Sequence, residues 1–228
     1  MTEALGDFKR RANISDGPID DRWSRMVFHL PYAFHGKRMY IDTFITERKQ
    51  TAEWQSFLQA LELNEPKRDE FDSDAGFADA MKSFTRAISK SDAYRTFVSD
   101  KLERAQRASG QVGNLYAASI FLALMSTLES DAHDGSDLTG KRLGFVAYGS
   151  GSKSKVFEAT VQPGFLEVAK NFGVFAQLEA RTAVTYDQYE ALHTKTAKDS
   201  IEARKGHFGL SEIGTEGPKL GARSYEVR

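Results

Sequence analysis

The sequence predicts an α/β fold with a mixed sheet, and the order of its apolar segments supports this. A short apolar run at residues 23–30 is typical of a buried strand, which Pro31 ends. Long segments of helical periodicity follow, and then a helix that is apolar on most sides. Apolar runs at residues 143–147 and 156–161 predict two more strands. Strands separated by long helices imply packed layers of helix and sheet.

The first half of the chain is predicted to be mostly helical. Residues 1–12 have the apolar spacing of a short amphipathic helix. Helical spacing of apolar side chains continues through residues 32–63 and returns in residues 77–105. Between them, residues 64–75 are charged and contain a proline, which favours a surface connection. The many charged side chains of residues 77–105 are interpreted as a solvated face.

The second half begins with the most apolar helix, which we place at residues 112–128. A further helix is expected at residues 186–195. Residues 208–210 and 224–227 are expected to form closing strands around a glycine-rich segment. No internal repeat marks a boundary, so we expect one domain over residues 1–228.

Composition excludes several classes of function. The formal net charge is -1, which provides no bulk field for nucleic acid or for an anionic membrane. We find no apolar stretch long enough to span a bilayer and no apolar block typical of a signal peptide, so we expect a cytoplasmic protein. Cysteine is absent, which excludes disulfides, thiolate metal sites and a cysteine nucleophile within these residues.

His29 is the first candidate functional residue, because it lies where the predicted strand 23–30 meets Pro31. Functional side chains gather at strand ends in α/β sheets, and an imidazole can donate a hydrogen bond to a carbonyl or transfer a proton near neutral pH. The alternative is a histidine that only satisfies its own hydrogen bonds. His35 follows six residues later and carries less weight alone.

Gly113 and Asn114 stand at the start of the predicted apolar helix. Glycine permits close approach of the backbone, and asparagine at a helix start usually caps it through its side-chain oxygen. That cap is the simpler interpretation. The other is an amide presented to a ligand oxygen beside a helix amino terminus, which favours negative charge.

Two further segments suit ligand binding. Gly149, Ser150 and Gly151 follow a predicted strand, and two glycines around a small hydroxyl leave backbone amides uncovered, as an oxyanion site requires. A plain turn is the competing interpretation. Lys37 and Arg38 could contact phosphates at the rim of a pocket, or they could be ordinary solvated charges.

Three motifs occur together and in a characteristic order: Phe-His-Leu-Pro-Tyr at residues 28–32, Gly-Asn-Leu-Tyr at 113–116 with Ser119, and Tyr-Gly-Ser-Gly at 148–151. In this combination the chain resembles the carboxy-terminal half of a hydroxymethylglutaryl-CoA synthase, a branch of the thiolase-like superfamily. The resemblance extends over most of the chain. It implies one half of the thiolase-like layered fold, a mixed sheet with helices on both faces.

The resemblance also implies an activity: a Claisen-type condensation of an acetyl group with acetoacetyl-CoA, followed by hydrolysis. Acetyl-CoA and acetoacetyl-CoA are then substrates, and no metal or redox cofactor takes part. His29 would hydrogen-bond the acetoacetyl carbonyl, Asn114 would contact the same acyl group, and the backbone at Ser150 would help to form the oxyanion site. The remaining implied contacts are Tyr116, Gly149 and Gly151 with substrate, and Lys37 and Arg38 with the phosphates of coenzyme A.

The chain departs from the family pattern in two ways. Many members have a lysine five residues after the histidine, where this chain has Phe34. The half that bears the catalytic cysteine and glutamate is also missing. Without a thiolate no acetyl-enzyme forms, and without the general base no enolate forms, so we expect this chain alone to be inactive.

Three hypotheses follow for the role of the chain. It is an enzyme subunit whose cysteine-bearing half is another chain, a noncatalytic remnant or truncated frame, or a polyketide β-branching subunit that acts on acyl groups held by a carrier protein. We expect His29, Asn114 and Ser150 to converge on one pocket. In the absence of the other half, we expect Phe121 and Leu122 of the apolar helix to be exposed, which favours pairing with that half or with a second copy.

Overall fold

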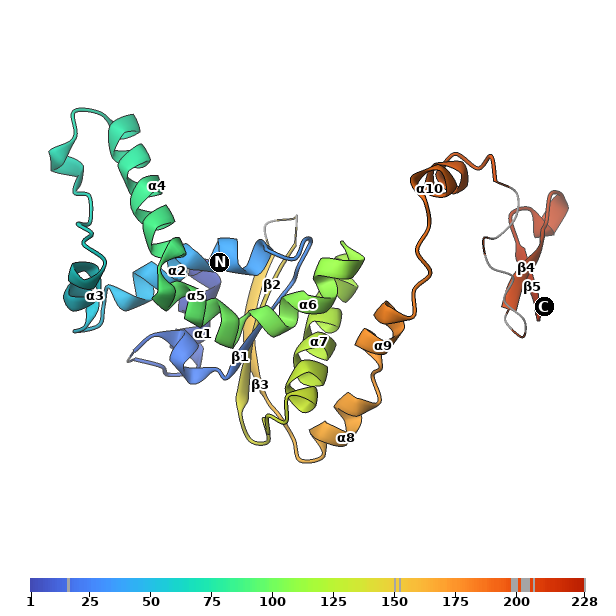
Figure 1. Cartoon of the computed structure of the whole chain (residues 1–228), viewed down its shortest axis with the longest axis horizontal. Coiled ribbons are helices and arrows are strands. Elements are labelled where there is room, and N and C mark those ends of the chain that lie inside the picture. The colour runs from blue at the N-terminus through green and yellow to red at the C-terminus, as the bar shows by residue number, and fades with distance from the viewer. Residues whose placement is uncertain are drawn as a thin grey trace. The chain divides into compact units, whose positions relative to one another are not determined.

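The computed structural model describes residues 1–15, 17–149, 151, 153–197, 201, 206 and 208–227 (Figure 1). These residues form two compact units, Met1–Ala180 and Arg181–Arg228, which we describe separately. In the described part of the chain, no helix is long and apolar enough to cross a membrane.

The first unit contains the three-stranded sheet that the sequence predicts. Its strands are β1 (Arg25–Phe28), β2 (Arg142–Gly149) and β3 (Lys153–Thr160), in the order β1-β2-β3. β1 runs parallel to β2, and β3 runs antiparallel to it. The mixed α/β class is therefore confirmed, together with the three predicted strands in one sheet.

Alternation along β1 assigns helices to the two faces of this sheet. On one face, Phe28 packs on Gly36 of α2 (His35–Arg48), and α1 (Thr2–Arg11) contacts β3. On the other face, Arg25 pairs with Asp131, and α7 (Ser119–His133) contacts β1. The expected arrangement with helices on both faces is observed.

The predicted long helices are each divided into shorter ones. The segment 32–63 contains α2 and α3 (Trp54–Ala60), and the segment 77–105 falls into α4 (Asp74–Lys90), α5 (Asp92–Lys101) and the start of α6 (Glu103–Val112). The Ser91 hydroxyl separates α4 from α5, because it accepts a hydrogen bond from the Tyr94 N–H and so caps α5. Hydrophobic periodicity does not register such a local cap.

The apolar helix begins later than predicted. α6 ends at Val112, Gly113 has a φ of 87°, and a 3-10 turn (Tyr116–Ala118) precedes the start of α7 at Ser119. A positive φ of this kind favours glycine and interrupts a helix. The expectation of one helix over residues 112–128 is therefore wrong.

The fully buried face of α7 is small and polar, while Ile120, Leu124 and Leu128 are partly buried against the core. The side chains buried along it are those of Ser119, Ala123, Ser126, Thr127, Ser130 and Asp131. Ser126 contacts α6 closely, since its hydroxyl donates to the Arg104 carbonyl at 2.5 Å. Phe121 is 65% exposed, and Leu122 and Leu124 are half-buried. The exposure predicted for Phe121 is confirmed, while that of the two leucines is partial.

Two short helices that the sequence did not predict complete the first unit. They are α8 (Phe165–Lys170) and α9 (Val174–Glu179). The carboxylate of Glu129 on α7 accepts hydrogen bonds from the Val174 and Phe175 N–H groups at 2.8 and 3.1 Å. A carboxylate at these otherwise unpaired amides anchors α9 to α7.

The second unit contains the helix and the two strands that the sequence predicts, and the two strands pair with each other as an antiparallel sheet. The helix is α10 (Tyr186–His193), and the strands are β4 (Phe208–Ile213) and β5 (Arg223–Val227). Thr185 and Gln188 form a reciprocal capping box at the start of α10.

Candidate functional site

His29 lies immediately after β1 and is held by α7. Its backbone N–H donates to the Val146 carbonyl of β2 at 3.0 Å, which extends the sheet by one residue. The Nδ1 atom of its ring lies 2.7 Å from the Ser119 hydroxyl, at the first residue of α7. The Leu30 N–H also donates to this hydroxyl, at 3.1 Å. One buried serine therefore fixes both the backbone and the imidazole at the strand end.

These contacts determine which ring nitrogen of His29 is available to a ligand. The Ser119 oxygen accepts from Leu30, and its own hydrogen can be donated to Nδ1. A neutral imidazole that accepts at Nδ1 carries its hydrogen on Nε2. Burial lowers the pKa of His29 below its ordinary value, so the neutral ring is favoured at neutral pH. In this tautomer His29 is a hydrogen-bond donor through Nε2, the ring nitrogen that Ser119 does not contact.

Four rings, which we call the ring cluster, lie together at this strand end: His29, Tyr32, His35 and Tyr148. Tyr148 of β2 is edge-on to His29, with ring centroids 5.0 Å apart and an interplanar angle of 81°. His35 stacks on Tyr148 at 5.1 Å and 27°, and Tyr32 is edge-on to His35 at 5.0 Å. Burial raises the pKa of Tyr148, and the neighbouring Tyr32 hydroxyl raises it further when that hydroxyl is ionised.

His35 differs from His29 in its hydrogen bonding. Both of its ring nitrogens are buried, and neither has a hydrogen-bond partner among the described residues. Burial, and secondarily the nearby His29, lower its pKa. An unpaired buried polar group is uncommon in folded proteins and requires an explanation.

Asn114 forms a local turn ahead of α7. Its side-chain oxygen accepts from the Tyr116 N–H at 2.8 Å, and the residue is exposed. The predicted capping bond is therefore made, but to the 3-10 turn before the helix rather than to the helix itself. Tyr116 is 77% exposed and has a φ of 50°. The structure thus places both residues on an open loop that leads into Ser119.

The glycine loop connects β2 to β3. Gly149 pairs with Lys153 across the hairpin, and a Cβ placed on Gly149 or Gly151 would meet no atom within 4 Å. The backbone at Gly149 and Gly151 is therefore open to close approach. Ser150 lies outside the described residues, so its predicted convergence with His29 and Asn114 stays a prediction.

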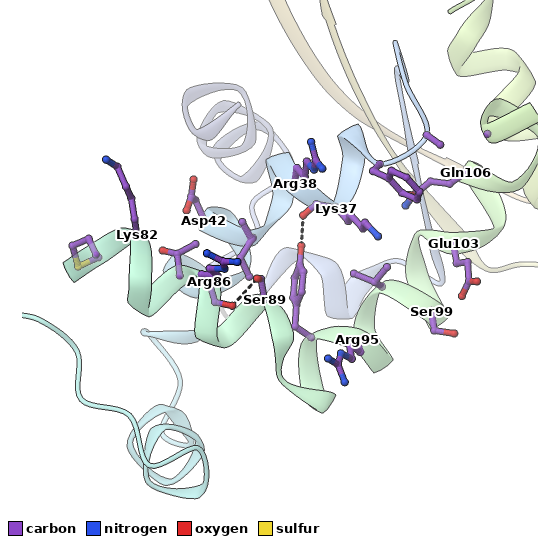
Figure 2. Close-up of a pocket in the computed structure, with 18 of the residues that line it drawn as sticks. Lys37, Arg38, Asp42, Lys82, Arg86, Ser89, Arg95, Ser99, Glu103 and Gln106 are labelled. Atoms are coloured by element: carbon purple, nitrogen blue, oxygen red, sulfur yellow. Dashed lines mark hydrogen bonds between the residues drawn. The ribbon is translucent and has the colours of Figure 1, made fainter. Parts of the chain in front are cut away.

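A large groove lies between α2, α4, α5 and α6, with a volume of about 1230 Å³. Figure 2 shows Lys37 and Arg38 of α2 together with Arg86 of α4 and Arg95 of α5 around it. Phe34, Ile41, Phe77, Met81 and Val98 give it an apolar lining. We call this the cationic groove, because six basic side chains line it against the two carboxylates of Asp42 and Glu103. The six are Lys37, Arg38, Lys82, Arg86, Arg95 and Arg107.

Several of these cations are available to a ligand. Within the described residues, Lys37, Arg38 and Arg86 pair with no carboxylate. The Lys37 Nζ atom lies 4.3 Å from the centroid of the Phe34 ring, and the Arg38 guanidinium lies 5.7 Å from that of Tyr32. Because Tyr32 in turn contacts His35, a continuous set of ring contacts joins Arg38 to His29.

Sequence reasoning found part of this arrangement. It identified His29, and it proposed Lys37 and Arg38 for phosphates; both of these line the cationic groove. It gave no weight to Arg86 and Lys82 of α4, whose spacing of four residues places them on one helical face. It also noted Ser119 only as part of a motif, without its hydrogen bond to His29.

The chain is similar to known proteins in both sequence and structure. Residues 9–206 match the family described as hydroxymethylglutaryl-coenzyme A synthase C terminal. The hydroxymethylglutaryl-CoA synthase of Haloferax volcanii is 26% identical over 193 residues, which are 85% of this chain and 42% of that protein. That of Schizosaccharomyces pombe is 28% identical over 222 residues, 91% of this chain and 46% of that protein. The chain thus spans less than half the length of these relatives.

A carrier-protein synthase is also similar in part. The polyketide biosynthesis 3-hydroxy-3-methylglutaryl-ACP synthase PksG of Bacillus subtilis is 35% identical over 82 residues, 36% of this chain and 19% of that protein.

Solved structures of this kind share the fold. MvaS in complex with 3-hydroxy-3-methylglutaryl coenzyme A has a TM-score of 0.66 at 21% identity, over 97% of this chain and 46% of that one. The curacin pathway HMG synthase in complex with holo donor-ACP has a TM-score of 0.64 at 20% identity, over 99% of this chain and 47% of that one. The fold is therefore thiolase-like, and with a match over residues 9–206 the chain belongs to the hydroxymethylglutaryl-CoA synthase family, of which it contains the carboxy-terminal domain.

Proposed function

We propose that this chain is the acyl-CoA-binding half of a hydroxymethylglutaryl-CoA synthase-like enzyme, and that another chain supplies the half with the catalytic cysteine and glutamate. The observation that carries the proposal is the cationic groove, which is joined to His29 through the ring cluster. Coenzyme A has an anionic nucleotide end and an acyl thioester end. The basic side chains of the groove suit the anionic nucleotide end, and His29 suits the acyl thioester end.

The contacts of His29 support a role in the condensation. Its Nε2–H would donate to the carbonyl oxygen of the acetoacetyl group, whose carbon the acetyl enolate attacks. Negative charge gathers on that oxygen as the new carbon–carbon bond forms, and a fixed donor stabilises it. Open backbone at Gly149 and Gly151 supports the oxyanion role proposed for the loop that contains Ser150. Asn114 and Tyr116 would meet the acyl group from the loop before α7.

The phosphate contacts are the most direct part of the proposal to test. We expect the chain alone to bind acetoacetyl-CoA, and to bind acetoacetyl-pantetheine, which lacks the nucleotide, more weakly. Arg86→Glu should weaken acetoacetyl-CoA binding by roughly tenfold or more, because a charge-assisted hydrogen bond contributes about 1.5–3 kcal/mol. Isothermal titration calorimetry measures each affinity.

Lys90→Glu is the matched control, since Lys90 lies one turn further along α4, is exposed and does not line the groove. It should change the affinity far less than Arg86→Glu. Equal losses in the two variants, or equal binding of the thioesters with and without the nucleotide, would remove the groove from the coenzyme A site.

Catalysis needs the second half. Mixed with a cysteine-bearing amino-terminal half, the chain should support acetyl transfer and condensation without added metal or redox cofactor, and alone it should support neither. A chain that binds acetoacetyl-CoA but stays inactive with every such half would favour the noncatalytic remnant.

The exposed side chain of Phe121 on α7 leads to a second prediction, which concerns association of the chain with another chain. Burying a side chain such as Phe121 contributes about 1.5–3 kcal/mol. We expect the chain to associate with the cysteine-bearing half or with itself, and Phe121→Asp to weaken that association by at least roughly tenfold with little loss of folding stability. Light scattering after size-exclusion chromatography measures the assembly state.

Tyr186→Asp is the control for this experiment, because Tyr186 is 71% exposed but lies on α10 in the other unit. It should leave the association unchanged. A well-folded monomer that ignores the partner half and binds no apolar dye would contradict the proposal of a split enzyme.

A second function is favoured by one specific finding. PksG is named as acting on an acyl group of an acyl carrier protein, and the chain shares 35% identity with it over 82 residues. An acidic protein surface would also meet the cations of the groove. If acetoacetyl-carrier protein binds the chain and acetoacetyl-CoA does not, the chain is a β-branching subunit instead.

A further inference from the structure

Tyr148 lies between two imidazoles that approach it from different directions. Its face is stacked on His35, with an interplanar angle of 27°, while His29 meets it at 81°. His29 and Tyr148 extend from the neighbouring strands β1 and β2, whereas His35 is the first residue of α2. The position of Tyr148 against His29 therefore depends on a ring contributed by the helix.

The His35 ring contacts two other rings of the cluster, those of Tyr148 and Tyr32. Neither of its nitrogens has a hydrogen-bond partner in the described residues, so hydrogen bonds do not explain why an imidazole stands there. Tyr32 adds an edge contact at 5.0 Å on this side of the stack. The observed role of the His35 ring is therefore packing, through its stack on Tyr148.

We propose that His35 is a positioning residue for His29: by stacking on Tyr148 it holds that ring against His29, which keeps Nδ1 of His29 on Ser119 and directs its Nε2–H to the ligand. The inference rests on the role proposed above for His29. It assigns to His35 no contact with substrate.

The surroundings of the pair also have an electrostatic consequence. The titratable groups that face the two imidazoles are Tyr148 of β2 and Tyr32 before α2, and Arg38 lies over Tyr32. The group from α7 is the uncharged Ser119 hydroxyl. Among the described residues, no carboxylate forms an ion pair with either ring. A proton on His29 therefore opposes a proton on His35, which adds to burial in lowering the pKa of His35.

The test is to follow His29 by NMR in the full chain, without ligand or partner. Nitrogen-15 shifts of the ring distinguish the two tautomers, and a pH titration gives the pKa. In His35→Ala we expect His29 to change from one tautomer to a mixture. In His35→Phe, which keeps the stacked ring and the burial of His29, we expect both the tautomer and the lowered pKa of His29 to be retained.

His133→Phe serves as the control, because the His133 side chain is 89% exposed and its removal should not affect His29. If His35→Ala does not fold, His35→Leu fills the space without an aromatic face and is read in the same way. A His29 tautomer and pKa that are the same in the alanine or leucine variant as in the parent chain would overturn the inference. Failure to bind acetoacetyl-CoA, with these spectra as expected, would instead count against the proposed function.

Discussion

Replacing Asp131 with asparagine is expected to destabilise the chain by about 3–5 kcal/mol. The carboxylate is fully buried on α7. It accepts two hydrogen bonds from Arg25 of β1, at 2.7 and 3.1 Å, and lies 3.0 Å from Nε of Arg104 on α6. Asparagine keeps the volume but removes the buried counter-charge of two largely buried guanidinium groups. Arg25 and Arg104 then retain the more exposed carboxylates of Asp100 and Asp134, at 3.5 and 3.3 Å. Urea unfolding followed by circular dichroism measures the free energy of unfolding.

Asp134→Asn provides a matched control for this change. Asp134 pairs with Arg104 at 3.3 Å and with Arg107 at 4.0 Å, but its side chain is 36% exposed. Solvent screens such a pair, so the expected loss is about 0–1 kcal/mol. Equal losses at the two positions would mean that Asp131 contributes no more than a surface ion pair.

Gly144→Ala is the second substitution with a large expected effect. A Cβ at this position of β2 would lie 2.1 Å from Cδ2 and 2.2 Å from Cε3 of Trp23. The indole is fully buried, contacts Phe8 and donates to Glu158 at 3.0 Å, so it has no free direction in which to move. We expect a loss of about 3 kcal/mol in the free energy of unfolding, at the upper end of overpacking effects.

Gly6→Ala tests the opposite environment with the same change. In α1 the added Cβ would come no closer than 3.7 Å, to the flexible end of Arg10. Alanine should stabilise this helix by about 0.5–1 kcal/mol, since glycine is the poorer helix former. If Gly144→Ala were as stable as the parent chain, the close packing of Trp23 on β2 would be wrong.

The features that the sequence predicted correctly are those that depend on local pattern. Apolar runs marked the strands around His29 and Tyr148, and the ends of β1 and β2 meet because the strands are parallel. Motif order then indicated the family. The end of α6 at Gly113 was missed, since Val112 and the apolar residues from Leu115 onward were assigned to one helix across that glycine.

The features that were not predicted depend on tertiary packing. The cationic groove exists because α4, α5 and α6 fold back beside α2, and hydrophobic spacing does not specify which helical faces meet. From the sequence alone, Arg86 was therefore interpreted as an ordinary solvated charge. The stack of His35 on Tyr148 likewise joins residues far apart in the chain, and the residue spacing around His35 gives no sign of it.

The Ser119 hydroxyl has a consequence for the order of folding. It joins His29 to a residue 90 positions later, and the helices α2 to α6 lie within the loop that this contact closes. Closing so long a loop carries an entropic cost that local helix formation does not. A chain whose helices have formed but whose β1 and α7 have not docked therefore has no site. A ligand that binds at His29 then recognises only the closed state, and its binding free energy adds to the stability of the whole unit rather than to one segment of it.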